Sequence, residues 1–385
     1  MNAQRTALIV GAGIGGLAAG VALRRAGWTV RVFERATSPR ELGFALLLAP
    51  NAISALRRLG LADRVIEGGA RFAGGEIRRF DGRPLRSFDL GGIESLVPEP
   101  PVVVLRQVLH GALLDALGPD ALTLDAEATG LEEAGGGVTL SLADGRRFDG
   151  DILVGADGIR SAIRARLHPD EPALRSSGLF AVRGVVHGAS TPHPDRGIQY
   201  FGRGLEAAVA PAGGGAVYWY ISLTGDYLAS GPREALPVAS RITANSDAWL
   251  RAIVQATREQ DARLDELFVR EPVPSWGRGR ATLLGDAAHP MLPHAGQGAA
   301  QALEDAVTLG HVLATAPDSE EGLRRYERLR FDRTRRIANT ARRNARAASL
   351  RNPLGCWLRD RLVRHVPTSV IANSYVAFGT PPELS

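Results

Sequence analysis

The stretch Gly11-Ala12-Gly13-Ile14-Gly15-Gly16 decides the fold, because it joins a short apolar run to a helical pattern. Residues 6–10 predict a buried strand, and residues 14–26 predict a helix that ends at Gly27. Residues 29–33 predict a second strand. A strand, a helix and a second strand over about 30 residues form a βαβ unit with parallel strands. The pattern therefore predicts the opening unit of a Rossmann-like fold.

The glycines of Gly11-x-Gly13-x-x-Gly16 have separate roles in such a unit. The first makes the tight turn, the second lets the backbone approach a pyrophosphate, and the third lets the helix pack on the strand. The helix N-terminus presents unpaired N–H groups to the anion. Glu34 closes the second strand, where a carboxylate can bind both hydroxyls of a ribose and disfavours a 2′-phosphate. We therefore expect a dinucleotide to contact Gly11, Gly13, Gly15, Gly16 and Glu34; a glycine-rich turn without a ligand is the alternative.

A second glycine-rich segment lies far along the chain. Residues 281–284 predict a buried strand that runs into Gly285 and Asp286, and Gly296-Gln297-Gly298 opens a predicted helix. A helix N-terminus with glycines at its mouth is again an anion site, and a reduced flavin carries negative charge on its pyrimidine edge. The early and late segments together indicate a large two-ended cofactor. We expect this cofactor to be FAD, which implies redox chemistry.

The composition excludes several other classes of protein. A length of 385 residues favours two domains. All 46 basic residues are arginine, against 41 acidic ones, and no stripe of basic and aromatic residues predicts nucleic-acid binding. Cys356 is the one cysteine, so no disulfide can form within the chain and a reducing compartment is expected. No run of about 20 apolar residues predicts a membrane span. We expect a cytoplasmic protein without a metal site.

Periodicity and turn residues predict the other elements. Asn51 starts a helix predicted over residues 51–59, and residues 105–117 predict an amphipathic helix. The remaining predictions are a β-meander over residues 121–148, a buried strand within 151–158, strands over 181–186, 207–210 and 216–222, helices over 246–256 and 260–268, and helices from 298 onward with a break at 352–353.

These elements predict an α/β fold. A Rossmann-like FAD-binding domain is interrupted by a mainly antiparallel β substrate domain and followed by C-terminal helices. The predicted division is an FAD-binding domain of residues 1–70, 101–175 and 272–330, a β-sheet substrate domain of residues 71–100 and 176–271, and a C-terminal helical region of residues 331–385.

Three motifs occur in the order found in one family. Residues 11–16 with Glu34 resemble its ADP-binding motif. Gly155-Ala156-Asp157-Gly158-Ile159-Arg160-Ser161 resembles its DG motif, which is credited with supporting both FAD and NAD(P)H. Gly285-Asp286 with Pro293-x-x-Gly296-Gln297-Gly298 resembles its flavin and ribityl motif. To about residue 345 the chain is similar to the FAD-dependent aromatic hydroxylases, the single-component flavoprotein monooxygenases typified by p-hydroxybenzoate hydroxylase.

The resemblance implies roles for individual residues. Glu34 would hold the adenosine ribose, with Arg35 beside the adenine. Arg106 would reach the FAD linker, Asp157 would support the pyrophosphate region, and Asp286 would bond a ribityl hydroxyl.

The segment of residues 285–298, called the late loop below, would contact the flavin ring itself. The resemblance implies that Pro293 flanks the reactive face and that the amides of residues 296–298 face the pyrimidine edge. Two residues depart from the family pattern. Phe44 stands where a small residue is usual, and Ala300 stands where many members have Asn. The first implies a tighter environment for the flavin or the substrate, and the second removes one flavin contact.

The resemblance also implies a reaction. NAD(P)H reduces the flavin, O₂ adds to it, and the resulting C4a-hydroperoxide hydroxylates an electron-rich aromatic or heteroaromatic small molecule, while the protein excludes water and orients the substrate. An epoxidase or a decarboxylating hydroxylase would use the same chemistry. A non-catalytic flavin- or ligand-binding relative is the alternative from another class.

Substrate activation requires a base where a phenolate must form. His294, inside the late loop, is the first candidate, and His289 is the second; a histidine held by backbone hydrogen bonds is the alternative for each. The apolar run at residues 44–48 suggests a hydrophobic ligand. The predicted substrate pocket contains Phe44, Leu46, Arg183, Tyr200, Tyr218 and Tyr220, with sheet packing, or for Arg183 a salt bridge, as the alternative.

Arginines are frequent between residues 324 and 364. This stretch predicts amphipathic helices that pack on the flavin domain, and peripheral contact with a membrane surface is the alternative.

Overall fold

The computed structural model describes residues 5–39, 44–90, 97, 99–189, 191, 193–229, 231 and 233–380. Its first unit has the predicted order. β1 (Thr6–Val10) and β2 (Thr29–Phe33) are parallel neighbours joined by α1 (Ile14–Arg25). They belong to a five-stranded parallel sheet with the order β18-β12-β1-β2-β8, which is completed by β8 (Leu122–Thr123), β12 (Ile152–Gly155) and β18 (Ala281–Leu283).

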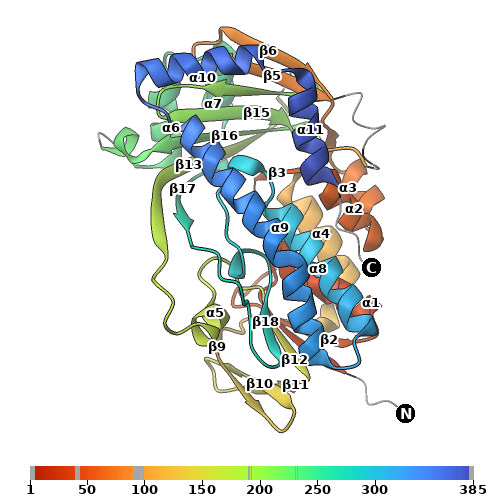
Figure 1. Ribbon diagram of the computed structural model, residues 1–385. Coiled ribbons are helices and arrows are strands. Elements are labelled where there is room, and N and C mark those ends of the chain that lie inside the picture. Colours follow the sequence, from red (N-terminus) through yellow and green to blue (C-terminus); the bar gives the residue numbers. More distant parts are fainter. Residues whose placement is uncertain are drawn as a thin grey trace.

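Helices cover this sheet and share its core. α1 packs against α4 (Arg106–Leu117) and α8 (Gly298–Thr315), and buried apolar residues of all three join those of the strands in one cluster (Figure 1). The predicted meander is confirmed as a separate three-stranded sheet of β9 (Ala128–Ala134), β10 (Gly137–Leu142) and β11 (Arg147–Gly150). The smaller elements nearby are β3 (Ala45–Leu48), α2 (Pro50–Arg58), α3 (Ala62–Glu67), β4 (Ala70–Arg71), β7 (Val102–Leu105) and α5 (Ala162–Leu167).

A seven-stranded sheet unites two distant parts of the chain. Its order is β17-β13-β16-β15-β14-β5-β6, and every neighbouring pair is antiparallel except β14 with β5. The strands are β5 (Gly74–Arg79), β6 (Pro84–Asp89), β13 (Arg175–His187), β14 (Arg196–Phe201), β15 (Leu205–Pro211), β16 (Ala216–Thr224) and β17 (Ala262–Val269). The division of the chain into domains stays a prediction.

The two faces of the large sheet have different partners. Trp219 is fully buried on the face covered by α6 (Ala235–Thr243) and α7 (Ala248–Ala256). Tyr218 and Tyr220 share the opposite face, as alternation predicts, with ring centroids 6.2 Å apart.

Tyr200 lies in the helix-covered core with Trp219, and its hydroxyl donates to Asp247 at 3.3 Å. Its predicted place in the substrate pocket is therefore wrong, because the pleat of β14 turns this side chain away from Tyr218 and Tyr220.

Two predicted elements differ in the structure. The helix predicted over residues 260–268 is the edge strand β17, which pairs with β13 so that Leu264 lies opposite Val182. Apolar residues three and four apart imitate a helical face there, but pairing with β13 decides the backbone. The helix predicted to start at Asn51 begins one residue earlier, at Pro50, which suits the first position of a helix.

The chain ends in three helices: α9 (Ser319–Ala348), α10 (Pro353–His365) and α11 (Thr368–Gly379). α9 packs along α8 and continues without interruption through the predicted boundary at residue 330, and Figure 1 shows α10 beyond it, outside the large sheet. Across the described ranges, none of the helices has both the length and the apolar character needed to cross a membrane.

We predict that Gly16→Ala disrupts the βαβ unit, because a Cβ at residue 16 would lie 1.9 Å from the carbonyl oxygen of Gly11. Overpacking of this kind destabilises a protein by about 1–3 kcal/mol, which urea unfolding would measure. Gly111→Ala in α4 is the matched control, since a Cβ at residue 111 would have no neighbouring atom within 4 Å. Equal unfolding midpoints for the two variants would contradict the prediction.

Candidate functional site

Three loops converge at one edge of the five-stranded sheet. Gly11, Asp157 and Asp286 follow shortly after the carboxyl ends of the neighbouring strands β1, β12 and β18. Parallel strands end at the same edge of a sheet, which is where such folds bind ligands. The early, middle and late motifs of the sequence therefore meet in space.

The early loop is shaped to receive an anion. Gly11 has φ +102°, and a Cβ there would lie 2.5 Å from the carbonyl oxygen of Ala156. α1 follows Gly13, its first turn holds no acidic residue, and no side chain of the described chain caps it. Its first N–H groups are thus left for a phosphate. His110, which the sequence analysis missed, holds this loop with Nε2 2.9 Å from the carbonyl oxygen of Ala12.

Glu34 lies beside this loop, as predicted from its position after β2. Its carboxylate accepts the N–H of Ala12 at 2.8 Å and that of Ala36 at 2.9 Å, which fixes its orientation. Each oxygen keeps a further lone pair for a ribose hydroxyl. Arg35 is exposed next to it. The contacts of both residues with a dinucleotide stay predictions.

Asp157 is held by hydrogen bonds from nearby residues, and its predicted support of the pyrophosphate region stays a prediction. Its carboxylate accepts from the hydroxyl of Ser161 at 2.5 Å and from the N–H of Ala162 at 2.7 Å, at the start of α5. Burial raises the pKa of Asp157, and these hydrogen bonds oppose the shift. Its backbone also packs under Gly11, so it supports the early loop from below.

The late loop ends in a second open helix terminus. Gly296 has φ +62°, Gln297 precedes α8, and no described side chain caps the first turn. Asp286 lies beside Gly298 there. It is open to solvent, although much of the protein surrounds it. Desolvation of the carboxyl group by the surrounding protein raises the pKa of Asp286, and the nearby His289 and Arg106 offset part of this rise. An accessible carboxylate and free amides at one helix end fit a polar group such as a ribityl chain with a flavin edge.

A buried ionic cluster holds the late loop in place. Arg330 of α9 is fully buried, and it donates to Asp305 at 2.7 Å and pairs with Glu304. Asp305 also accepts the N–H of Gly285 at 3.0 Å. Burial would raise the pKa of Asp305, but His289 and Arg330 more than offset it and bring the pKa to about 2. Asp305 therefore stays ionised at the base of the loop.

The same cluster reaches the start of α8. The side chain of Asn51 donates to Gln297 at 3.0 Å and to Glu304 at 2.6 Å. Gln297 is buried and also accepts from Gln301 at 3.0 Å. Gln297 is thus placed at the predicted helix opening, but its side-chain amide serves this network.

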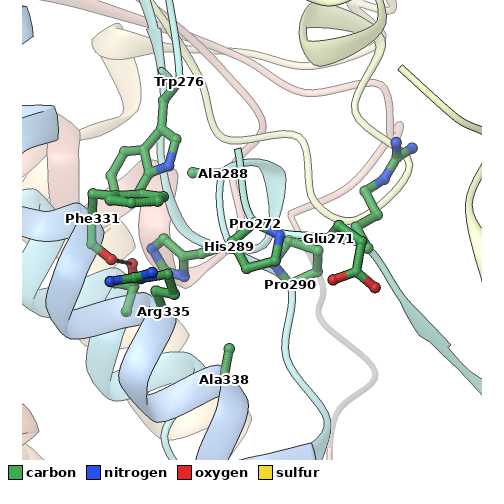
Figure 2. Close-up of a pocket in the computed structure, with 11 residues that line it drawn as sticks. Glu271, Pro272, Trp276, Ala288, His289, Pro290, Phe331, Arg335 and Ala338 are labelled. Carbon is green, nitrogen blue, oxygen red and sulfur yellow. Dashed lines mark hydrogen bonds between the residues drawn. The ribbon is translucent and has the colours of Figure 1, made fainter. Parts of the chain in front are cut away.

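His289 belongs to the cluster as well. Its Nε2 lies 2.5 Å from Asp305, and its ring is 5.2 Å from that of Trp276. Figure 2 shows it beside a cavity lined also by Pro272, Phe331 and Arg335, with a volume of about 10 Å³, enough for one water. This position gives His289 a structural partner, and Tyr218 and Tyr220 are not among the lining residues.

His294 faces the large sheet. Its side chain is buried, with Nε2 3.1 Å from the hydroxyl of Ser222 and 3.6 Å from Glu206. Burial and the charge of Arg183 lower the pKa of His294 to about 4. Pro293, before it, is exposed. Nδ1 of His294 is buried and has no partner in the described chain.

Glu206 was missed in the sequence because nothing marks it there. It accepts from Tyr220 and from Gln199, each at 3.3 Å, on the same face of the sheet. Burial raises its pKa to about 7, although these hydrogen bonds oppose the shift. A histidine and a carboxyl group that both favour their neutral forms therefore lie together against the sheet.

The other residues of the predicted substrate pocket lie in different surroundings. Arg183 lies opposite Tyr220 in the sheet and pairs with Asp265 at 3.7 Å. Phe44 packs with Tyr218 in an apolar cluster between β3 and the large sheet. Leu46 instead packs against the core of the five-stranded sheet.

We predict that Arg330→Met lowers the free energy of unfolding by about 3–5 kcal/mol, because among the described residues it removes the one arginine that pairs with buried Asp305 and leaves Glu304 with Arg333 alone. Denaturant titration would measure this. Arg328→Met, at an exposed position of α9, is the control and should change little. Similar losses in both variants would show that the ionic cluster is not the cause.

Known proteins share this architecture. The family model described as FAD binding domain matches residues 4–341. Aurachin C monooxygenase/isomerase of Stigmatella aurantiaca is 35% identical over 367 residues, which are 94% of this chain and 95% of that protein. The FAD-dependent urate hydroxylase of Klebsiella pneumoniae is 32% identical over 345 residues, 88% of each chain.

A solved structure agrees along the whole chain. The crystal structure of Klebsiella pneumoniae HpxO complexed with FAD and uric acid has a TM-score of 0.92 and 29% identity, over 99% of this chain and 98% of that one. The resemblance drawn from the motifs is confirmed. The chain belongs to the family described as FAD binding domain, and FAD is its cofactor.

Proposed function

We propose that this protein is a monooxygenase that uses FAD, NAD(P)H and O₂ to hydroxylate an electron-rich aromatic or heteroaromatic small molecule. The observation that carries the proposal is the pair of uncapped helix N-termini, α1 and α8, at one edge of a parallel sheet with the exposed carboxylate of Asp286 beside the second. Relatives named as monooxygenases and hydroxylases support it. Bound FAD, reduced by NAD(P)H, supplies the oxygen-transfer chemistry.

The protein's own residues bind and orient the cofactor in this proposal. Glu34 and Arg35 bind the adenosine end, and the first amides of α1 bind the pyrophosphate. Arg106 and Asp286 contact the linker and the ribityl chain, and the amides at the start of α8 face the pyrimidine edge.

The substrate lies against the face of the large sheet that carries Tyr218, Tyr220 and Arg183. Phe44 packs against the same apolar cluster as Tyr218. Asp265 lies 3.7 Å from Arg183 and also pairs with Arg263 at 2.9 Å, so it offsets the charge of Arg183 only in part. Because burial pushes His294 and Glu206 toward their neutral forms, the part of the site beside them favours an uncharged ring over an aromatic acid.

His294 and Glu206 handle the proton of the substrate. Nδ1 of His294 is buried and, like Nδ1 of His289, has no hydrogen-bond partner among the described residues; we assign it the role of accepting the proton of a ring O–H or N–H group. Nε2 of the same ring faces Glu206, which stabilises the resulting imidazolium when it is ionised. Glu206 has a pKa raised to about 7, so it is neutral below that pH and ionised above it. Proton acceptance therefore improves as the pH rises through about 7.

Glu206→Gln should remove this dependence on pH. We expect kcat/KM of the wild type to rise through about pH 7, and the variant to lose the rise and about 10²-fold of activity at higher pH. Asp265→Asn, on the same sheet face, is the control that should keep the rise. A variant that retains the wild-type profile would exclude Glu206 from proton handling.

The activity itself can be tested with purified, FAD-loaded protein. We expect NADH or NADPH oxidation to accelerate with neutral phenols or N-heteroaromatic rings more than with aromatic acids, and mass spectrometry to find one added oxygen atom. An epoxide, or a product that has lost CO₂, would assign the alternative oxygenations. Flavin bound without stimulated oxidation by any ring would favour a non-catalytic relative.

A further inference from the structure

Helix α10 has its polarity inverted relative to an ordinary surface helix. Its large apolar side chains face solvent, and its central ion pair faces the protein. We name the apolar set the outer stripe; its members, with the exposed fraction of each residue, are Leu354 (71%), Trp357 (56%), Leu358 (49%) and Leu362 (60%). Their spacing of three and four residues places them on one side of the helix.

The buried side of α10 explains why the helix cannot turn over. Arg359 donates to the carbonyl oxygen of Gly202 at 3.0 Å and to Asp360 at 2.9 Å, and it lies over the ring of Phe201 at 4.8 Å. Asp360 is also 3.8 Å from Arg79 of β5. Turning the outer stripe inward would expose Arg359 and Asp360 and leave the groups they contact without partners. The stripe is therefore held outward by the fold.

The exposed charged side chains of α10 itself include Arg361 and Arg364 and no carboxylate. Arg361 lies over the ring of Trp357 at 5.6 Å, and Arg364 and His365 are exposed in the last turn. The one acidic residue of α10, Asp360, is buried. On the neighbouring end of α9, Arg343 and Arg346 are exposed, and neither pairs with a carboxylate within the residues described.

We propose that α10 docks this protein on an anionic lipid surface. Its leucines and Trp357 enter the boundary between headgroups and acyl chains, and the arginines beside them contact lipid phosphates. An apolar face bordered by arginine and tryptophan is the pattern of helices that lie in a membrane interface. A second copy is disfavoured because it would bring two arginine-rich faces together. The inference is independent of the reaction assigned above.

Vesicle flotation with the FAD-loaded protein tests the proposal. We expect it to bind vesicles of phosphatidylcholine mixed with phosphatidylglycerol, and to bind phosphatidylcholine alone at least about tenfold more weakly. The triple variant Leu354→Gln, Leu358→Gln and Leu362→Gln should lose about tenfold or more of the binding to the mixed vesicles. Leu329→Gln, which removes a 42% exposed leucine of α9, is the matched control and should bind normally.

Two further readouts separate the contributions. Arg361→Gln with Arg364→Gln should weaken binding and reduce its dependence on salt. Brominated lipids should quench Trp357 fluorescence in the wild type, and Trp357→Phe should bind while losing that quenching. Each variant should retain FAD and its circular dichroism spectrum, since the changed side chains are exposed.

Three results would overturn the proposal. They are wild-type protein that stays unbound with anionic vesicles at low salt, a triple variant that binds as well as the wild type, and a wild-type dimer in analytical ultracentrifugation that the triple variant converts to a monomer. The last result would assign the stripe to a contact between copies of the chain.

Discussion

The buried guanidinium of Arg330 is the interaction on which the site depends. It pairs with both Glu304 and Asp305 inside the protein, Arg333 supplies a second positive charge at Glu304, and the two carboxylates in turn hold Gly285, His289 and Asn51. Burying three charges carries a large desolvation penalty, so the arrangement is stable only with its hydrogen bonds complete. That requirement fixes α8, α9, α2 and the late loop relative to one another. The position of Asp286 follows from it.

The same rigid frame leaves two helix ends open. α1 and α8 start without side-chain caps among the described residues, and a free protein must leave those amides to water. Natural helices usually satisfy them, and a cap is worth about 1 kcal/mol. Two uncapped helix N-termini at one sheet edge can instead donate their N–H groups to an anionic ligand. The fold therefore favours the FAD-bound state over the free protein.

How far the sequence predicts this structure depends on the range of the interactions. The βαβ unit, the meander and both glycine loops are local patterns, and all of them were predicted. Arg330 and Asp305 are 25 residues apart, and in a chain with 46 arginines no local signal separates one buried arginine from the exposed ones. β17 and Tyr200 failed for a related reason, because their positions are set by strand pairing and pleat rather than by the residues beside them.

Two buried carboxyl groups show how the protein separates support from chemistry. Asp305 has Arg330 in direct contact and a pKa of about 2, so its charge is permanent. Glu206 accepts from the neutral groups Tyr220 and Gln199, and burial raises its pKa to about 7. Environments that push the pKa values of similar groups apart assign them different tasks. Asp305 contacts a cation, so its permanent charge can hold the loop. Glu206 accepts hydrogen bonds from Tyr220 and Gln199, which are both neutral, so it can exchange a proton near neutral pH.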